Sequence, residues 1–356
     1  MRIVLDARMY GLENAGIGRY EINLIRSLVK LDKKNHYLIL LRQKYFNSLS
    51  FENKNFEKIL ADYPHYSWQE QIFLPIQLIK LRPDLVHFLH FNLPVFYPGK
   101  FVVTIHDLIK HESRGLLTTT RRPWFYWFRY IVYRTLVWWV IKRAKQIITP
   151  SRFWKDKINP RKTVVVYEGV DSSLQGLRVQ KFKKKGRYLL CVGQLYPHKN
   201  VILAVKAAKE VKIKLKIACS RNVFAERFEK QVRDLEAEEW VEMLGFVSDE
   251  KLKALYQNAL VFVFPSRLEG FGLTGLEAMA NGCPVVAAQA SCLPEIYGTA
   301  AVYFEPNKAE SLIGAIKAAI ANREKLIKLG RKQVKKYNWE KTARETIEIY
   351  ENCFSL

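Results

Sequence analysis

Cysteine is scarce in this sequence of 356 residues: there are five, widely spaced, and no two form a Cys-x-x-Cys pair. An odd number of scattered cysteines argues against a disulfide framework or a zinc site and is typical of a reducing compartment. No run of 18 apolar residues occurs, so no transmembrane span is expected. Residues Met1 to Asp6 reach an acid too early for the apolar core of a signal peptide. These absences predict a globular protein of the cytoplasm.

One stretch of the chain is rich in Lys and Arg and contains no Asp or Glu. The formal net charge is +24, yet no carboxylate lies between Glu112 and Asp156, where ten Lys and Arg residues occur. Arginines interrupt the stretch 121–145 too often for it to cross a bilayer, but its interleaved Trp, Tyr and Arg are typical of a helix on an anionic membrane surface. A core helix with a basic outer face is the alternative. Contact through 121–145 would make the protein peripheral on the inner face of the cell membrane. No RNA-binding motif occurs, so nucleic acid is not an expected partner.

The length exceeds the size at which one core usually keeps growing, so two domains of roughly 170 residues are expected. Short apolar runs alternate with helical patterns in each half, which indicates βα units and parallel sheets. The predicted fold class is therefore α/β, with two Rossmann-like doubly wound domains. We expect the first domain at 1–171, a basic linker at 172–187, the second domain at 188–337, and a C-terminal helix at 338–356 that packs back on the first domain.

Twelve apolar runs mark the expected strands. Six lie in the first half, at 3–7, 37–41, 85–89, 101–105, 146–149 and 163–166. Six lie in the second half, at 189–192, 215–218, 241–244, 261–264, 284–288 and 301–304. Ligands of open α/β sheets bind at the carboxyl ends of the strands, so the loops after Ala7, Ile105, Val192 and Phe264 are the candidate sites.

The loop after Phe264 has the richest pattern. Glu269 and Glu277 bracket a turn that contains Gly270 and Gly272 and leads into a helical segment. The glycines and the helix N-terminus offer backbone N–H groups and the positive end of a dipole, which suit a phosphate or a polyol. A plain βα turn with solvated glutamates is the alternative.

Three other loops carry residues suited to a ligand. Gly16 and Gly18 end the loop after the first strand and allow close approach to the backbone, although a flexible connection would look the same. His106 stands at the end of another strand, and Lys199 follows a turn at Gly193, where its charge can meet a phosphate. Neither a GxGxxG fingerprint nor a Walker lysine is present. No isolated Asp-x-Asp loop suggests a metal site.

Together these loops resemble the motifs of the retaining glycosyltransferases of family 4 (GT4), whose GT-B architecture sets two Rossmann-like domains across a cleft. The motifs that carry the resemblance are Gly16 with Gly18, Thr104-Ile105-His106-Asp107, Val192-Gly193 with Pro197-His198-Lys199-Asn200, and Pro265-Ser266 with the E-x7-E element from Glu269 to Glu277. Weaker similarity continues through 149–151, 166–171, 245–247 and 293–295 to 339–342. The resemblance therefore covers nearly the whole chain.

The resemblance implies a role for each position. Glu277 would bind the ribose of a donor nucleotide, Glu269 would lie by the donor sugar, and Lys199 would neutralise the diphosphate leaving group. Gly16 would lie against that diphosphate from the opposite domain, and His106 would border the sugar. His106, Glu269 and Lys199 are thus the predicted catalytic residues. The predicted donor-binding residues are Gly16, Gly18, Gly193, Gln194, Lys199, Arg267, Glu269, Gly270, Phe271, Gly272, Leu273 and Glu277.

Gln194 departs from the family pattern, because many relatives carry an arginine at this position, directly after the glycine of the lysine motif. An amide offers neither a charge nor a bidentate fork, so the expected diphosphate site has one cation fewer. Arg267, or another basic residue nearby, could compensate. The departure bears on donor affinity more than on the reaction.

The resemblance implies a retaining, metal-independent hexosyltransferase that moves a sugar, mannose as the first choice, from a nucleotide diphosphate donor to a glycan or lipid-linked acceptor in cell-envelope polysaccharide synthesis. GDP-mannose is the first expected donor and a UDP-sugar the second, with no cofactor. Two alternatives stay open. One is a nucleotide-sugar epimerase or phosphorylase on the same scaffold, and the other is a non-catalytic module that binds a sugar nucleotide.

Overall fold

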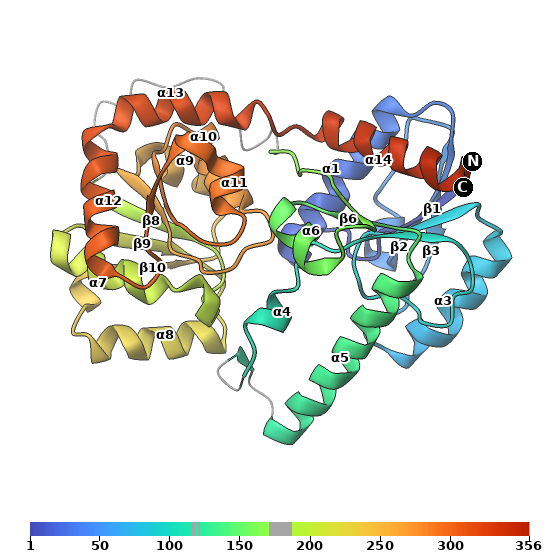
Figure 1. Ribbon diagram of the computed structural model, residues 1–356, viewed down its shortest axis with the longest axis horizontal. Helices are drawn as coiled ribbons and strands as arrows, with labels where there is room; N and C mark the ends of the chain where they lie inside the picture. Colours follow the sequence, from blue (N-terminus) through green and yellow to red (C-terminus); the bar gives the residue numbers. More distant parts are fainter. Residues whose placement is uncertain (116–117, 120–121, 171–186, 356) are drawn as a thin grey trace. The chain divides into compact units, whose positions relative to one another are not determined.

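The computed structural model describes residues 1–115, 118–119, 122–170 and 187–355 (Figure 1). These residues divide into two compact units. Met1–Leu108, Arg122–Gly169 and Trp339–Leu356 form the first unit, whereas Ile109–Arg121 and Val170–Asn338 form the second. The segment that starts at Ile109 thus belongs to the second unit, although the sequence suggested one continuous domain from 1 to 171. Apart from Arg187, the linker expected at 172–187 lies outside the described residues.

A seven-stranded sheet forms the centre of the first unit, in the order β3-β2-β1-β4-β5-β6-β7. Its strands are β1 (Arg2–Asp6), β2 (His36–Leu41), β3 (Phe56–Leu60), β4 (Leu85–Phe88), β5 (Phe101–Thr104), β6 (Gln146–Thr149) and β7 (Thr163–Val165). Every pairing between neighbours is parallel, with Leu5 of β1 opposite Ile39 on one side and His87 on the other. The carboxyl ends of these strands therefore share one edge.

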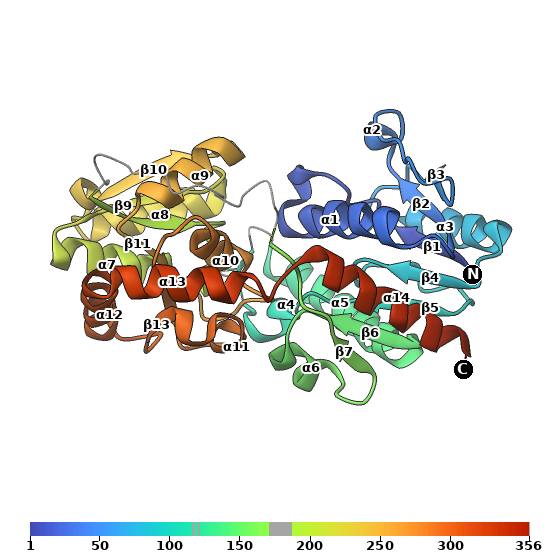
Figure 2. The same cartoon turned by 90° about the horizontal axis from the view of Figure 1, so that it is seen from above.

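Helices cover both faces of this sheet. They are α1 (Ala15–Leu31), α2 (Gln43–Phe46), α3 (Trp68–Leu81), α5 (Pro123–Arg143), α6 (Arg152–Ile158) and α14 (Trp339–Ser355), with a short 3-10 turn, η1 (Leu12–Asn14), before α1. Figures 1 and 2 show α1 and α14 side by side over one face, while Figure 1 shows α3 and α5 over the other. The chain thus returns to the first unit at its C-terminal helix.

The second unit has a six-stranded parallel sheet in the order β10-β9-β8-β11-β12-β13. Its strands are β8 (Tyr188–Val192), β9 (Lys214–Ala218), β10 (Val241–Gly245), β11 (Val261–Phe264), β12 (Val285–Ala288) and β13 (Ala301–Phe304). Its helices are α4 (Ile109–Glu112), η4 (Pro197–Lys199), α7 (Val201–Val211), α8 (Val223–Asp234), η5 (Glu238–Trp240), α9 (Asp249–Asn258), α10 (Leu273–Ala280), α11 (Leu293–Tyr297), η6 (Gly298–Ala300), α12 (Ala309–Ala321) and α13 (Arg323–Val334). The predicted fold class, two Rossmann-like domains, is confirmed.

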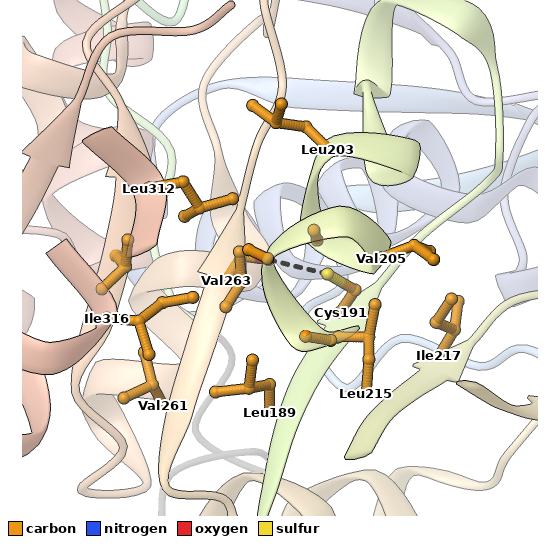
Figure 3. Packing of buried hydrophobic residues seen from close by; sticks show 14 of the residues in the cluster. Leu189, Cys191, Leu203, Val205, Leu215, Ile217, Val261, Val263, Leu312 and Ile316 are labelled. Carbon is orange, nitrogen blue, oxygen red and sulfur yellow. Dashed lines mark hydrogen bonds between the residues drawn. The ribbon is translucent and has the colours of Figure 1, made fainter. Parts of the chain in front are cut away.

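The core of the second unit shows why its strands read as unbroken apolar runs. Figure 3 shows side chains of β8, β9 and β11, among them Leu189 and Val263, packed with Leu203 of α7 and Leu312 of α12. The thiol of Cys191 lies in this core and donates to the carbonyl oxygen of Val263 at 3.0 Å. Burial raises the pKa of that thiol. All five cysteines are buried and free, so they act as small apolar residues.

All twelve predicted strands are present, each within one residue of its predicted bounds, but β3 was missed. Its sequence, Phe-Glu-Lys-Ile-Leu, buries Phe56 and exposes Glu57 and Leu60. An edge strand of this kind pairs on one side alone and carries charges, which blunt the free edge. It therefore lacks the apolar run by which the other strands were recognised.

A buried chain of hydrogen bonds ties the C-terminal helix to the first sheet. The hydroxyl of Tyr350 lies 2.6 Å from Nδ1 of His87, and Nε2 of His87 lies 2.9 Å from Oγ1 of Thr104. The hydroxyl of Tyr20, on α1, completes the chain at 3.2 Å from Thr104. Burial, and after it the nearby His106, lowers the pKa of His87 to about 3. His87 is therefore neutral in the folded protein at neutral pH.

This neutral histidine predicts a loss of stability in acid. The unfolded chain takes up a proton at His87 below its ordinary pKa of 6.5, whereas the folded chain does so only near 3. The unfolding free energy should therefore fall as the pH drops from about 6.5 to 3, by up to about 1.4 kcal/mol per pH unit. Urea unfolding followed by tryptophan emission reports the first unit, which holds seven of the eight tryptophans.

The matched variant is His87→Gln, which does not titrate in this range. The difference between the two proteins isolates His87 from all other titrating groups. A difference that stays constant between pH 7 and pH 4 would contradict the assignment of a neutral, buried His87.

Candidate functional site

The turn between β11 and α10 is built around the hydroxyl of Tyr297. This hydroxyl donates to the carbonyl oxygen of Gly272 at 2.6 Å, and Gly272 precedes α10 with a φ of 95°. A Cβ on Gly275 would lie 2.2 Å from the same hydroxyl, and one on Gly272 would lie 2.6 Å from it. Both positions therefore require glycine, because the helix N-terminus packs directly on the tyrosine.

Lys199 and Glu269 form an ion pair within the second unit. The Nζ atom of Lys199 lies 2.7 Å from each carboxylate oxygen of Glu269. The lysine side chain is 24% exposed and the glutamate side chain 8%. A backbone hydrogen bond of 2.8 Å from the N–H of Arg267 to the carbonyl oxygen of His198 joins the two loops that carry the pair. The structure thus brings together two residues predicted to act on the same ligand.

Neighbouring contacts hold this pair in place. The backbone N–H of Glu269 donates to Oγ of Ser291 at 3.1 Å, and the thiol of Cys292 donates to the carbonyl oxygen of Glu269. Burial, and then the charge of Lys199, lowers the pKa of His198 to about 4, so this histidine adds no charge at neutral pH. Lys199 is the charged group of its loop that faces the carboxylate.

Glu277 is buried in the first turns of α10. The hydroxyl of Tyr256 donates to Oε2 of Glu277 at 3.2 Å, and burial together with this carboxylate raises the pKa of Tyr256. Phe271 is also buried, edge-on against Tyr337 at 5.5 Å. Arg267 is exposed. The predicted residues from Arg267 to Glu277 thus lie in the loop after β11 and in the helix α10 that follows it.

Gln194 is held by Asn222, the residue directly before α8. Gly193, directly after β8, has a φ of 130°, and the next residue, Gln194, accepts a hydrogen bond of 2.8 Å from Nδ2 of Asn222. Asn222 also caps α8, since its Oδ1 accepts from the N–H groups of Phe224 and Ala225. The side-chain oxygen of Gln194 is therefore occupied within the protein, and its NH₂ group is the end that can donate to a ligand.

Sequence reasoning did not single out Arg221 or Asn222, the second of which contacts the predicted site residue Gln194. They line a cavity of about 170 Å³ together with Ala225, Glu226 and Glu229. An asparagine directly before an amphipathic helix is a recognisable N-cap signal, so Asn222 could have been found. Its bond to Gln194 could not, because it depends on the pairing of β8 with β9.

In the first unit, His106 follows β5 as predicted. Its Nε2 donates to the carbonyl oxygen of Leu89 at 3.1 Å, and its Nδ1 lies 3.1 Å from Oε1 of Glu168. The ring of Tyr20 meets it edge-on at 4.7 Å. Both ring nitrogens thus have protein partners, and Glu168, which the sequence did not single out, fixes the orientation of the ring.

Gly16 and Gly18 lie inside α1, not at the end of a loop as predicted. A Cβ on Gly18 would lie 1.8 Å from the carbonyl oxygen of Gly11, so Gly18 lets the preceding loop pack on the helix. A Cβ on Gly16 would meet no atom within 4 Å, and Gly16 is exposed. Packing of the preceding loop therefore requires glycine at position 18, whereas no packing contact requires it at position 16.

A buried charge cluster fixes the loop after β1. Arg8 donates to both carboxylate oxygens of Asp6, at 2.7 and 2.8 Å, and to Glu70 at 2.7 Å. Glu70 also accepts two hydrogen bonds from Asn92. Burial, and then the nearby Asp6, raises the pKa of Glu21 well above its ordinary value. Among the described residues, no three His, Cys, Asp or Glu side chains gather as a metal site would require.

Comparisons with known proteins bear on both units. A family model for group 1 glycosyl transferases matches residues 176–336, and a model for glycosyltransferase family 4 matches residues 15–174. The chain is similar to the O-antigen chain mannosyltransferase RfbU of Salmonella typhimurium, with 32% identity over 250 residues. That alignment covers 63% of this chain and 70% of RfbU.

Solved structures show the same fold at low identity. The sucrose-phosphate synthase of Thermosynechococcus elongatus aligns over 100% of this chain and 99% of its own, with a TM-score of 0.73 and 19% identity. Anabaena HepE, solved in complex with UDP and glucose, aligns over 99% of this chain and 100% of its own, with a TM-score of 0.72 and 17% identity.

The two glycines of α1 predict a contrast between folding and function. Gly18→Ala should lower the unfolding free energy by more than about 2 kcal/mol, because the new methyl group would overlap a backbone oxygen. Gly16→Ala should leave stability unchanged or raise it by about 0.5–1 kcal/mol through better helix propensity. Urea unfolding measures both.

Only Gly16 should also affect activity independently of stability. If its open backbone faces a donor, Gly16→Ala should reduce kcat/KM for sugar transfer in a fully folded enzyme. Transfer at the wild-type rate by the Gly16→Ala protein would remove Gly16 from the binding site.

Proposed function

The chain belongs to the group 1 glycosyltransferases, which makes it a hexosyltransferase, and we propose that it moves mannose from a nucleotide diphosphate donor to a glycan or lipid-linked acceptor. The proposed reaction retains the configuration of the sugar, needs no metal ion, and serves the synthesis of a cell-envelope polysaccharide. The similarity to RfbU, whose name describes an O-antigen chain mannosyltransferase, supports mannose and the polysaccharide setting. GDP-mannose is accordingly the first donor to test. HepE was solved with UDP, so UDP-sugars are the second group of donors to test.

The ion pair of Lys199 with Glu269 is the observation that carries this proposal. A lysine with 24% exposure is close enough to solvent to meet an incoming diphosphate, and its charge is already directed into the loop after β11. The diphosphate would take the lysine from the carboxylate, and Glu269 would then be available to the hydroxyl groups of the sugar. Charge builds on the diphosphate as the glycosidic bond breaks, so a lysine and the N-terminus of α10 aimed there would stabilise the transition state.

Glu277 and Gln194 fit the nucleotide side of the same site. Glu277, held by Tyr256, would accept hydrogen bonds from the ribose hydroxyl groups. Gln194 replaces the family's arginine with a neutral donor, whose NH₂ group is oriented by Asn222 and would donate to a phosphate oxygen. The protein would therefore bind the donor with one positive charge fewer, and the oriented amide of Gln194 would take the place of the arginine.

Gly16 and His106 of the first unit stay predicted site residues. Gly16 has an exposed stretch of helical backbone, and a Cβ placed there would have no atom within 4 Å, which is what close approach of a ligand would need. His106 has both ring nitrogens engaged, by Leu89 and Glu168, so it suits positioning better than proton transfer. We therefore assign no catalytic base. In a front-side attack the leaving phosphate itself takes the proton of the acceptor.

Two substitutions separate the roles of Lys199 and Glu269. Lys199→Met should weaken binding of GDP or UDP about 10–100-fold, because a charge-assisted hydrogen bond to the phosphate is lost. Glu269→Gln should bind the same nucleotide equally or more tightly, since the lysine loses its competing carboxylate, while sugar transfer falls. Isothermal titration measures binding, and Lys206→Met, an exposed lysine of α7, is the control. If Glu269→Gln weakens nucleotide binding as much as Lys199→Met does, the proposed exchange of partners is wrong.

The donor and the stereochemistry need a separate experiment. A panel of nucleotide sugars is screened by thermal shift, since a ligand of the folded state raises the melting temperature, and GDP-mannose is expected to give the largest rise. NMR of the product should show the anomeric configuration of the donor, and transfer should continue in EDTA. Inversion, or loss of activity in EDTA, contradicts the corresponding part of the proposal.

The same experiment tests the alternative activities. Conversion of the donor without an acceptor would indicate an epimerase, and dependence on inorganic phosphate would indicate a phosphorylase. Tight binding without turnover on any acceptor would indicate a binding module.

A further inference from the structure

Helix α5 exposes an apolar stripe to solvent. Trp124, Phe128, Ile131 and Trp138 follow one another at intervals of four, three and seven residues, and each is more than half exposed. The buried residues of this helix, Tyr130, Val137 and Val140, repeat at intervals of seven and three on the opposite side. An ordinary surface helix is polar on its outer side, whereas α5 is apolar on both sides. The alternative, a core helix with a basic outer face, accounts for the buried side of α5 but not for the apolar stripe on its exposed side.

Helix α3 has the same unusual outer side. Its exposed residues Trp68, Ile72, Ile76 and Ile79 are spaced four, four and three apart, and Phe73 beside them packs on Trp68 at 5.8 Å. Its buried side contains Leu74 and Leu78. Two helices of the first unit thus present apolar side chains where polar ones are usual. We call these two stripes the outer stripes of α3 and α5.

The two helices are joined by the loop after β4. Gln71 of α3 donates to the carbonyl oxygen of Leu93 at 3.3 Å, and the ring of Phe91 meets Tyr133 of α5 at 5.4 Å. Figure 1 shows both helices over the same face of the sheet. The outer stripes therefore belong to one surface. Exposed apolar surface of this extent marks a binding region in a folded protein.

Every exposed charge of these two helices is positive. Helix α5 contains no carboxylate, and the single carboxylate of α3, Glu70, is fully buried in its bonds to Arg8. Arg129 and Arg134 are exposed beside the stripe of α5, and Lys142 lies over the ring of Trp138 at 5.1 Å. A protein partner would have to match cations scattered among aromatic rings, whereas an anionic lipid surface matches them without specific pairing.

We propose that the outer stripes of α3 and α5 bind an anionic phospholipid bilayer, with the aromatic and aliphatic side chains in the interface and the arginines on lipid phosphates. Both helices then lie along the surface of the bilayer. Consistent with this, no helix of the described chain combines the length and hydropathy needed to cross a membrane. Burial of the apolar side chains provides affinity, and the cations provide the preference for anionic lipid.

Vesicle sedimentation of the full chain tests this surface, without donor or acceptor, so its failure is separable from failure of the proposed reaction. Phosphatidylcholine vesicles are compared with vesicles that also contain phosphatidylglycerol. The wild-type protein should bind the anionic vesicles more tightly, and added salt should weaken that binding.

Phe128→Ser/Ile131→Ser and Ile72→Ser/Ile79→Ser should each lower the partition coefficient at least about tenfold. Arg129→Glu/Arg134→Glu should do the same.

Matched controls separate this surface from the net charge of +24. Lys325→Glu/Lys328→Glu reverses two exposed charges of α13, the same change in charge, and should leave binding within about twofold of wild type. Ile320→Ser/Phe354→Ser, at exposed positions of α12 and α14, controls for lost apolar area. All substituted residues are exposed, and unchanged melting temperatures verify folding.

Three results would overturn the proposal. The first is equal binding to neutral and anionic vesicles. The second is an equal loss in the α13 control, which would assign the effect to total charge. The third is no vesicle binding together with a dimer that Phe128→Ser/Ile131→Ser dissociates, which would assign this surface to a second copy of the chain.

Discussion

In each sheet every strand runs parallel to its neighbours, so the loops that follow the strands leave along one edge. In the second unit the order of the strands reverses between β8 and β11, which are paired directly. Loops that leave such a pair diverge to opposite faces and open a crevice, which is where ligands of this fold bind. This pairing explains why Lys199 and Glu269, seventy residues apart, meet at 2.7 Å. The order of the strands thus determines where the loops of Lys199 and Glu269 meet, and the side chains determine what those loops can bind.

The ion pair also bears on how a donor could bind at this edge. Both side chains are largely withdrawn from solvent, so much of their desolvation has already occurred in the free protein. A diphosphate that replaced Glu269 as the partner of Lys199 would exchange one anion for another and would not bury a hydrated cation. The surrounding geometry is rigid, because Ser291 and Cys292 hold the backbone of Glu269 and Tyr297 holds the first turn of α10. Preorganisation of this kind suits stabilisation of a developing charge.

Residues within continuous patterns could be predicted, and those that depend on contacts across the fold could not. The twelve predicted strands are recognisable from their apolar runs, and His106, Lys199 and Glu269 from their places after strands. The contact of Tyr297 with Gly272 and that of Glu168 with His106 could not be predicted, because each joins residues that lie far apart in the sequence. Gly16 and Gly18 look alike in the sequence, yet only the packing of Gly11 distinguishes them. Strand β3 was missed because an edge strand need not be apolar.

The two faces of the first sheet show that its exposed apolar stripes are not a general property of the unit. On the face covered by α1 and α14, the helices bury their apolar sides in a shared core and meet solvent with ion pairs such as Lys30 with Glu340 and Lys34 with Glu351. On the other face, α3 and α5 also bury an apolar side but meet solvent with aromatic rings, isoleucines and positive charge. The helices on both faces bury an apolar side against the sheet, so both faces contribute to the core. Folding alone therefore does not explain why the exposed sides of α3 and α5 are apolar and basic while those of α1 and α14 are not. Binding to a surface that is apolar and negatively charged would explain it.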